Sequence, residues 1–178
     1  MSGEIRVALE DWIFWNDPEV AARLGRLIQA IRADGEELVK AGLEKLVKLH
    51  VYGNRVTSLE PLRGLTSLNT LNLRGNPLEP GALACLRKCK RLGMLDLSNT
   101  GLGDISGLEF CRAHILELHD NPDLTGLEVI STMKRLCCLY LDTQAARRYD
   151  IQALAPQLIE CGELDGLSVY VWPEKYYN

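Results

Sequence analysis

LTSLNTLNLRGNP, residues 65–77, is the stretch that decides the fold of this chain. Leu71 and Leu73 alternate with polar neighbours, which predicts a short strand with its leucines on one side and its polar side chains on the other. Asn76 follows that strand. Its amide side chain can hydrogen-bond backbone groups that a strand-to-loop corner leaves unpaired. The stretch therefore predicts one strand and one corner of a layered structure.

The same spacing returns along the chain, so that a first leucine, two strand positions and a corner residue recur in order. The copies are Leu46, Leu49, Val51 and Asn54; Leu68, Leu71, Leu73 and Asn76; Leu92, Leu95, Leu97 and Thr100; Ala113, Leu116, Leu118 and Asn121; Leu136, Leu139, Leu141 and Gln144; and a degenerate last copy, Leu164, Leu167, Val169 and Trp172. The corner residues are 22, 24, 21, 23 and 28 positions apart. These intervals fall in the range of roughly 20–29 residues of leucine-rich repeats, and the chain resembles that family over about residues 43–172, in about six repeats.

The resemblance implies an α/β fold, a leucine-rich repeat solenoid that curves as a right-handed superhelix. A parallel sheet would line its concave side, and 3₁₀ or helical segments its convex side. The spacers 55–65 and 101–108 carry apolar residues at every third position, which suits 3₁₀ turns because positions i and i+3 eclipse. The repeats look closest to the short class, of about 22 residues, typified by the regulatory subunit of protein phosphatase 1. We expect true helices in two longer spacers, one beginning near Pro80 and one within 145–163 that Pro156 interrupts or begins.

One structural domain with a cap at each end is predicted. Residues 1–42 are expected to form an N-terminal helical cap, because Asp17 and Pro18 suit a helix start and an apolar stripe at helical spacing follows. This cap would cover the apolar edge of the first repeat. The repeats then span 43–172, and residues 173–178 form a C-terminal tail or cap, with Pro173 preventing further ladder pairing.

The charge balance of the chain bounds its partners. A net charge of −4 and a pI of about 5.4 argue against non-specific binding to nucleic acid or to anionic membranes. No run of 18 apolar residues is present, and the N-terminus does not resemble a secretory signal. We therefore expect an intracellular, cytoplasmic protein, with nuclear or cytoskeletal association left open.

The six cysteines are expected to be reduced in such a compartment. Cys85 and Cys89, four residues apart, could share one side of a helix and so imitate a metal site. No second pair has ligand-like spacing. Burial as small hydrophobic residues on the convex side is the better interpretation. We predict neither a metal nor a cofactor.

The function is expected on the concave face, because the repeat leucines point inward and the residues between them point outward. The resemblance implies a non-catalytic protein-binding module, scaffold or adaptor, or a small subunit of a larger assembly, that holds a protein partner there. Tyrosines and two apolar residues lie among basic positions near the first repeats and acidic ones in the middle. The predicted partner-binding residues are His50, Tyr52, Asn72, Arg74, Met94, Asp96, Ile115, Glu117, His119, Tyr140 and Asp142.

Two other functions remain open at this stage. A structural subunit would contact its neighbours through its convex side or through its aromatic-rich ends, Trp12–Trp15 and Trp172–Tyr177. An enzyme is the weakest alternative. Cys111, His114, Glu117 and His119 are close in sequence, but the repeat register separates a nucleophile from its base, and no phosphate-binding or metalloprotease motif is present.

Overall fold

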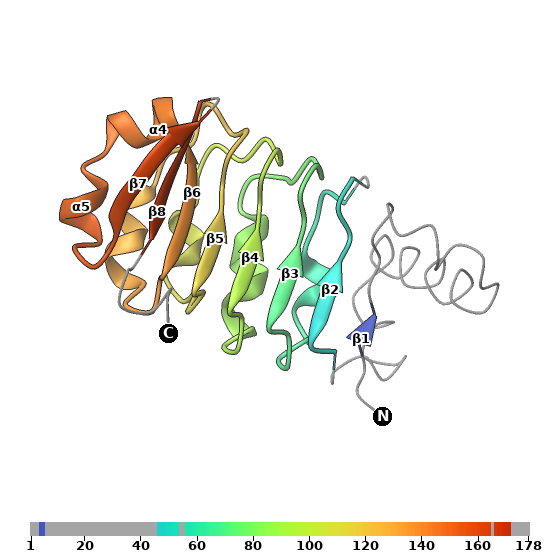
Figure 1. Cartoon of the computed structure of the whole chain (residues 1–178). Coiled ribbons are helices and arrows are strands. Elements are labelled where there is room, and N and C mark those ends of the chain that lie inside the picture. The colour runs from blue at the N-terminus through green and yellow to red at the C-terminus, as the bar shows by residue number, and fades with distance from the viewer. Residues whose placement is uncertain (1–3, 6–45, 54–55, 165, 172–178) are drawn as a thin grey trace.

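An eight-stranded sheet organises the chain, and the computed structural model describes residues 4–5, 46–53, 56–164 and 166–171. The strands are β1 (Glu4–Ile5), β2 (Lys48–His50), β3 (Thr70–Asn72), β4 (Met94–Asp96), β5 (Ile115–Glu117), β6 (Cys138–Asp142), β7 (Ile159–Leu164) and β8 (Leu167–Val171). They follow one another in chain order up to β6, after which β8 lies between β6 and β7 (Figure 1). Every neighbouring pair from β1 to β6 is parallel.

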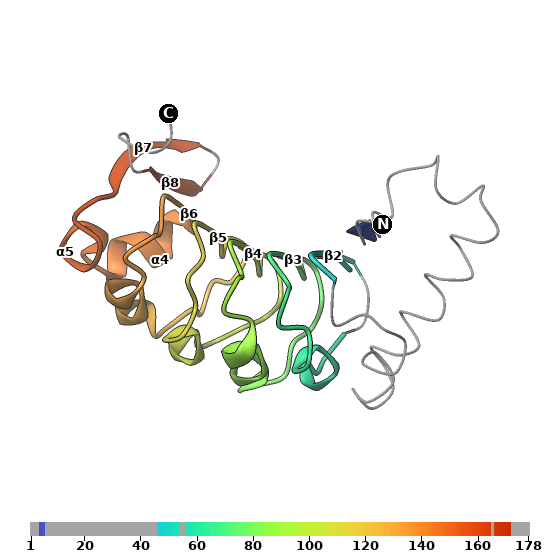
Figure 2. The same ribbon diagram turned by 90° about the horizontal axis from the view of Figure 1, so that it is seen from below.

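The spacers that connect the parallel strands run along the side of the molecule opposite the sheet. They contain the 3₁₀ helices η2 (Glu60–Leu62), η3 (Ala82–Lys88), η4 (Ser106–Leu108) and η5 (Leu127–Thr132). Figure 2 shows these short helices on one side and the strands on the other. The predicted solenoid, with a parallel sheet on its concave side and 3₁₀ segments on its convex side, is confirmed for these repeats. No helix in the described ranges is long and apolar enough to cross a membrane.

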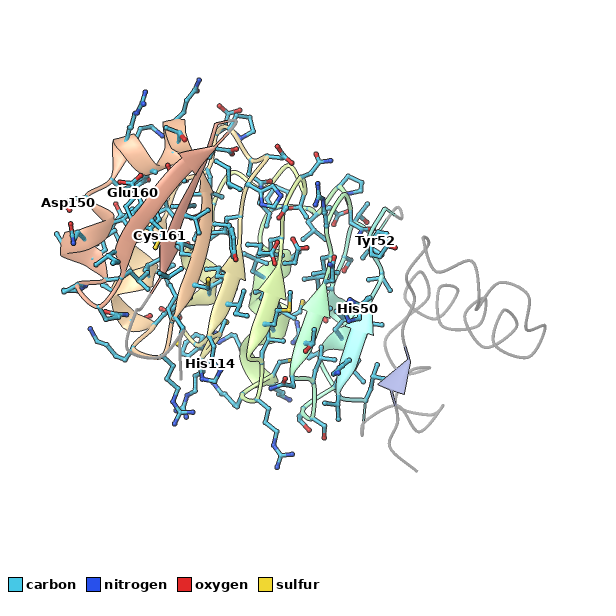
Figure 3. All side chains as sticks on the ribbon, viewed as in Figure 1. His50, Tyr52, His114, Asp150, Glu160 and Cys161 are labelled. Carbon is cyan, nitrogen blue, oxygen red and sulfur yellow. The ribbon has the colours of Figure 1, made fainter. Side chains whose placement is uncertain are left out.

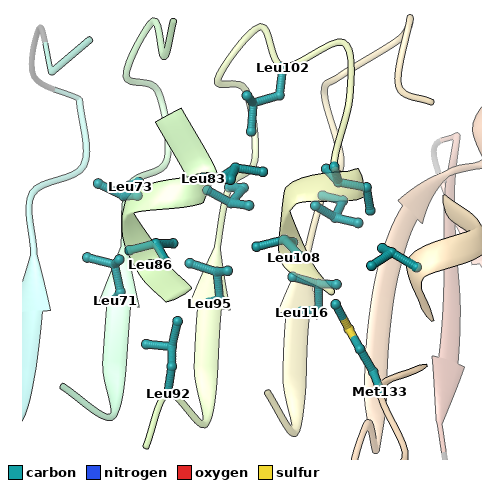
Figure 4. Packing of buried hydrophobic residues seen from close by; sticks show 14 of the residues in the cluster. Leu71, Leu73, Leu83, Leu86, Leu92, Leu95, Leu102, Leu108, Leu116 and Met133 are labelled. Atoms are coloured by element: carbon teal, nitrogen blue, oxygen red, sulfur yellow. The ribbon is translucent and has the colours of Figure 1, made fainter. Parts of the chain in front are cut away.

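The repeat leucines fill the space between the two sides. Leu71, Leu95 and Leu116 occupy the middle of three successive strands in register, and all three are completely buried. Leu86, Leu108 and Met133 close the core from the opposite side (Figure 4). Because each leucine packs against the same position of the neighbouring repeat, one continuous core runs the length of the repeats.

A buried amide holds each of two corners where a strand turns into its spacer. Nδ2 of Asn76 donates to the carbonyl oxygens of Val51 at 2.9 Å and Leu73 at 2.7 Å, and its Oδ1 accepts from the N–H of Val56 at 3.1 Å. The corner role predicted for this residue is confirmed. Asn121 repeats the arrangement two repeats later: it donates to Leu97 and Leu118 and accepts from Thr100.

The spacer 78–91 differs from its prediction, since η3 is a 3₁₀ helix and not an α-helix. Its buried residues are Ala82, Leu83, Cys85 and Leu86. Ala82 and Cys85 are three positions apart, and so are Leu83 and Leu86. A 3₁₀ helix places residues at this spacing directly above one another on the same side. Cys85 and Cys89 are buried on the convex side, as expected. Burial raises the pKa of the Cys89 thiol to about 11.

The spacer after β6 is helical, as predicted, but its helices are short. They are α4 (Thr143–Arg148) and α5 (Ile151–Leu154). Oδ1 of Asp150 caps α5 by accepting from the N–H of Ala153 at 3.0 Å. Pro156 neither begins nor interrupts a helix: it follows α5, whose end agrees with the steric restriction that proline places on the residue before it.

The predicted sixth repeat is wrong. Leu167 and Val169 lie in β8, which pairs antiparallel with β6 and with β7, so the last two strands form a hairpin. β7 occupies residues that we expected to belong to a convex spacer. Figure 2 shows this hairpin rising above the line of the other strands, on the side away from the 3₁₀ helices.

The predicted caps fall mostly outside the described residues. The helix expected from Asp17, the aromatic stretch Trp12–Trp15 and the tail 173–178 all lie there, as does Trp172. Within the predicted N-terminal cap, β1 is described, and it pairs with β2 at Glu4–Lys48 and Ile5–Leu49. The sheet therefore extends by one strand beyond the first repeat.

Candidate functional site

The outer face of the sheet, called the concave face below, collects the predicted partner-binding residues. Strand pairing aligns His50, Asn72, Asp96, Glu117 and Tyr140 in one row across β2 to β6. A second row aligns Lys48, Thr70, Met94, Ile115 and Cys138. Tyr52, Arg74, His119 and Asp142 stand at or just beyond the ends of these strands. All eleven predicted residues except Asp96 keep part of their surface exposed.

The ends of this face differ in their surroundings. Figure 3 shows His50 and Tyr52 on the first repeat, far from Glu160 and Cys161 on the hairpin. Arg74 is exposed on the third strand's end, whereas Asp96 and Glu117 occupy the central strands. The basic positions predicted near the first repeats and the acidic positions predicted in the middle therefore lie where the register placed them.

Asp96 serves the fold more than the surface, because its side chain is only 3% exposed. Its Oδ1 accepts from the N–H of Ser98 at 2.9 Å and from Oγ of Ser98 at 2.7 Å. That hydroxyl also lies 3.0 Å from Nδ1 of His119. Since the hydroxyl proton goes to the carboxylate, the ring nitrogen is the donor in the second bond. The three side chains form a buried chain that fixes the turn after β4.

Asp142 and Asn72 are also engaged with the backbone. The two carboxylate oxygens of Asp142 accept from the N–H groups of Asp120 and Asn121, each at 3.0 Å, and so hold the corner of the preceding repeat. Oδ1 of Asn72 accepts from the N–H of Arg74 at 3.0 Å. These residues lie where the sequence placed them, but each has a structural role that the repeat pattern did not reveal.

Glu117 carries the least favourable charge on the concave face. It lies directly opposite Asp96 on the neighbouring parallel strand. Partial burial raises the pKa of the Glu117 carboxyl, and the charge of Asp96 raises it further, while Arg74 acts in the opposite direction. Like charges that face each other across a strand pair are destabilising. A cation bound beside Glu117 on the concave face would therefore offset the repulsion between the two carboxylates.

The hairpin adds apolar residues to the concave face that the repeat pattern missed. In β8, Val171 pairs with Cys138, Val169 with Tyr140 and Leu167 with Asp142. Directly paired residues point to the same side of a sheet. Ser168 and Tyr170, which the spacing of the expected sixth repeat would place on the concave face, instead pair with Leu141 and Leu139 and point inward, and both are buried. The direction of β8 causes this reversal.

A sequence signal for the hairpin exists at its turn. Asp165 and Gly166 form an Asp-Gly pair between two strand-like segments, which is a strong short-range indication of a β-hairpin. Gly166 has a φ of 82°, in the left-handed region that favours glycine. Reading this pair as a turn, and not as part of a repeat, would have found the missed concave residues.

A polar cleft of about 350 Å³ lies beneath the hairpin, between its inner face and the helices α4 and α5. Its lining includes Arg147, Asp150, Glu160 and Tyr170. At its base the hydroxyls of Thr143 and Ser168 lie 3.2 Å apart. Asp150, which Figure 3 places at this end of the molecule, is already occupied by its cap hydrogen bond.

The residues of the weak enzyme hypothesis are distributed over different surroundings. Cys111 packs against the hydrophobic core, while Glu117 and His119 belong to the concave face. His114 is exposed just before β5 (Figure 3). Ser98, whose hydroxyl lies 3.0 Å from Nδ1 of His119, is completely buried. Within the described ranges, no group of three or more His, Cys, Asp or Glu side chains could hold a metal ion.

Comparison with known proteins agrees with the repeat architecture. A family model described as leucine-rich repeats, in two copies, matches residues 44–80. Two solved structures from Listeria monocytogenes strain 4b F2365 are similar. Internalin C2 is 22% identical over 66% of this chain and 54% of that one, with a TM-score of 0.56. An internalin, inlF, is 27% identical over 68% of this chain and 46% of that one, with a TM-score of 0.46.

The likeness to internalin C2 supports the fold alone, at this level of identity. This chain spans about half the length of each of these two internalin structures. Among curated proteins, none is similar enough to count as a match. Residues 44–80 thus match leucine-rich repeats, the remaining repeats share the fold, and the concave face is the surface that they build.

Proposed function

We propose, from the premise that this chain carries leucine-rich repeats, that it is a non-catalytic module that binds a protein partner on its concave face. Leucine-rich repeat proteins commonly bind other proteins, and stacked repeats provide an extended surface for this purpose. The chain would act as an adaptor or as a small subunit of a larger assembly.

The observation that carries this proposal is the contrast between the two sides of each strand. The inward side chains, such as Leu71 and Leu95, are completely buried in the core. Their neighbours on the other side, among them Met94, Ile115 and Tyr140, keep part of their surface exposed although they are large and apolar or aromatic. Methionine and aromatic residues are enriched in protein interfaces relative to other surfaces. Several strands thus contribute to one contiguous patch that the fold alone does not require.

Two finer statements belong to the same proposal. The three-residue 3₁₀ helices η2 and η4 support assignment of these repeats to the short class typified by the protein phosphatase 1 regulatory subunit. We also propose an intracellular, cytoplasmic location, in which the six cysteines, all free in the structure, would stay reduced.

Capture of partners from a cell lysate, followed by mass spectrometry, tests the binding role. The wild-type chain is compared with a double variant, Tyr140→Ala with Glu117→Lys, and with Lys134→Glu as a control. Lys134 is exposed in the spacer between η5 and β6, outside the concave face. We expect one identified protein that is retained by the wild type and by the control and lost from the double variant. A partner that all three chains retain equally would refute the use of the concave face.

Asp96 is unsuitable for this test, although the sequence points to it. Its substitution would break the hydrogen bonds to Ser98 and so disturb the turn after β4. The turn after β4 is held by Asp96, Ser98 and His119, whereas Glu117 is half-buried at the surface. Thermal unfolding of the three chains should therefore give similar midpoints, which separates lost binding from lost folding.

A further inference from the structure

An apolar row crosses the concave face from the repeats into the hairpin. It consists of Met94 on β4, Ile115 on β5, Cys138 on β6, Val171 on β8 and Ile159 on β7, each paired in register with the next. The row spans four strand-to-strand steps of about 4.8 Å each, or roughly 19 Å. A surface of this length would accommodate about 13 residues of an α-helix.

The row is accessible at both of its ends. Met94 and Ile115 are half-buried, and Ile159 is 43% exposed, although it is a large apolar residue. In the middle, Cys138 and Val171 are buried, and Sγ of Cys138 donates to the hydroxyl of Tyr140 at 3.6 Å. Half-buried Val169, paired with Tyr140, widens the apolar surface over the middle strands. The hairpin rises beside this surface and borders it at the end of the sheet (Figure 2).

An acidic pair lies immediately beside the apolar row. Asp96 follows Met94 by two residues on β4, and Glu117 follows Ile115 by two residues on β5, so both carboxylates are on the same face as the row. They are paired across the two strands. Arg74 is the cation that acts on Glu117 from within the chain. The Asp96 carboxylate is engaged by Ser98, which leaves Glu117 as the carboxylate most available to a ligand.

We propose that this face binds a segment of a protein partner whose apolar side chains contact the accessible residues Met94, Ile115, Val169 and Ile159 and whose adjacent Lys or Arg side chain pairs with Glu117. This inference rests on the proposed function and specifies the chemistry of the partner. The argument for such an occupant is charge complementarity: the half-buried carboxylate of Glu117 beside the apolar row favours a ligand that brings a cation next to its apolar residues. A basic side chain at Glu117 would also reduce the repulsion between the paired carboxylates.

The proposal places binding on the second half of the sheet. The first repeats carry Lys48, His50 and Arg74 on the same face, and these would disfavour a basic ligand. The hairpin, which replaces the expected sixth repeat, supplies Ile159 and Val169 to the binding surface. The end of the solenoid therefore takes part in recognition and is not merely a cap.

A random-peptide display library panned against the intact chain tests the chemistry of the partner. We expect the selected peptides to carry Lys or Arg next to apolar residues. A synthetic copy of the strongest peptide should then bind about tenfold more weakly to Glu117→Lys and to Ile159→Asp, each a change of about 1.4 kcal/mol. Asp123→Lys, a charge-matched change at an exposed loop position, should bind like the wild type.

Each of the other outcomes counts against the inference. It is overturned if no peptide is selected, if the selected peptides lack basic residues, or if Glu117→Lys and Asp123→Lys reduce binding equally. Because Ile159 is exposed, Ile159→Asp should leave folding intact, and circular dichroism spectra of the variants check this. Glu117→Gln, which keeps the size of the side chain, should also weaken binding, but by less than the lysine variant.

The same experiment separates this inference from the proposed function. If the selected peptides are insensitive to Glu117→Lys and Ile159→Asp but are lost in Arg74→Glu, the concave face still binds protein and only the partner chemistry is wrong. If the partner captured from lysate is insensitive to every concave variant, the proposed function itself fails.

Discussion

The five-strand parallel region, β2 to β6, and the C-terminal unit from α4 to β8 build one sheet by two different rules. In the first region every strand is parallel to its neighbour, and the same leucine positions are buried in each repeat. In the second, β8 runs antiparallel to β6, and the inward side chains include Ser168 and Tyr170. The sheet continues, but the repeat does not.

The difference begins at the corner after β6. The side chains of Asn76 and Asn121 turn their strands into spacers with four backbone hydrogen bonds each to the surrounding corner. At the equivalent place Gln144 is exposed within α4, and the chain goes directly from β6 into a helix. The carboxylate of Asp142 completes the preceding corner. Where the succession of parallel strands ends, the helix α4 thus follows the strand directly.

The largest difference between the two regions is expected in their cores. Leu95→Ala removes a completely buried side chain from the middle of the parallel region. It should lower the free energy of unfolding by about 3 kcal/mol, since large-to-small changes of this kind leave a cavity. Val169→Ala, at a half-buried hairpin position, should lower it by less than about 1 kcal/mol. Urea denaturation measures both, and equal losses would show that the hairpin is packed as tightly as the repeats.

The corner residues offer a second, smaller contrast. Asn121→Ala leaves two buried carbonyl oxygens and the N–H of Thr100 without their side-chain partner, so we expect a loss of about 2 kcal/mol. Gln144→Ala, at the equivalent but exposed position, should change stability by less than about 0.5 kcal/mol. Thermal unfolding measures the stability of both variants. A lower unfolding midpoint for Gln144→Ala than for Asn121→Ala would contradict the stabilising role of the asparagine corner.

A glycine contact between neighbouring convex spacers gives a third test. Gly126 has a φ of 77°, and a Cβ there would overlap Oδ1 of Asp104 and lie 2.8 Å from the backbone nitrogen of Ser106. Gly101 has a similar φ of 68° but open space around a Cβ. Gly126→Ala should therefore destabilise by about 1–3 kcal/mol, and more than Gly101→Ala, which is strained only in its backbone. Identical urea midpoints for the two variants would mean that the neighbouring spacer moves to accommodate the Cβ at position 126 without any loss of stability.

The smallest effect is expected for the concave charge. The pKa of the Glu117 carboxyl is raised above its ordinary 4.5, so the folded state holds this proton more tightly than the unfolded state does. The stability that the bound proton contributes is present at low pH and is lost as the pH rises through the folded-state pKa. Glu117→Gln should therefore be slightly more stable than the wild type at neutral pH, and the gain should shrink as the pH falls toward 4.5. Unfolding curves over this range check the sign. A gain that grows at acid pH would contradict the assignment.

The leucine spacing predicted the solenoid, its core and the concave positions through Tyr140, because a parallel repeat fixes which side each residue faces. It failed at β8, where Leu164, Leu167 and Val169 satisfy the spacing but the chain reverses direction between β7 and β8. It also could not reveal that Asp96 and Asp142 are used by the fold. Those hydrogen bonds join residues that only the three-dimensional turns bring together.

Site-specific photo-crosslinking tests the central claim, that the concave face binds a protein partner, most directly. A photoreactive phenylalanine derivative is placed at Met94 on the concave face and, in a separate chain, at Phe110 on the convex side, where Arg87 stacks 4.1 Å from its ring centroid. With the captured partner present, we predict a crosslinked complex from position 94 and none from position 110. A crosslink from position 110 alone would contradict the account.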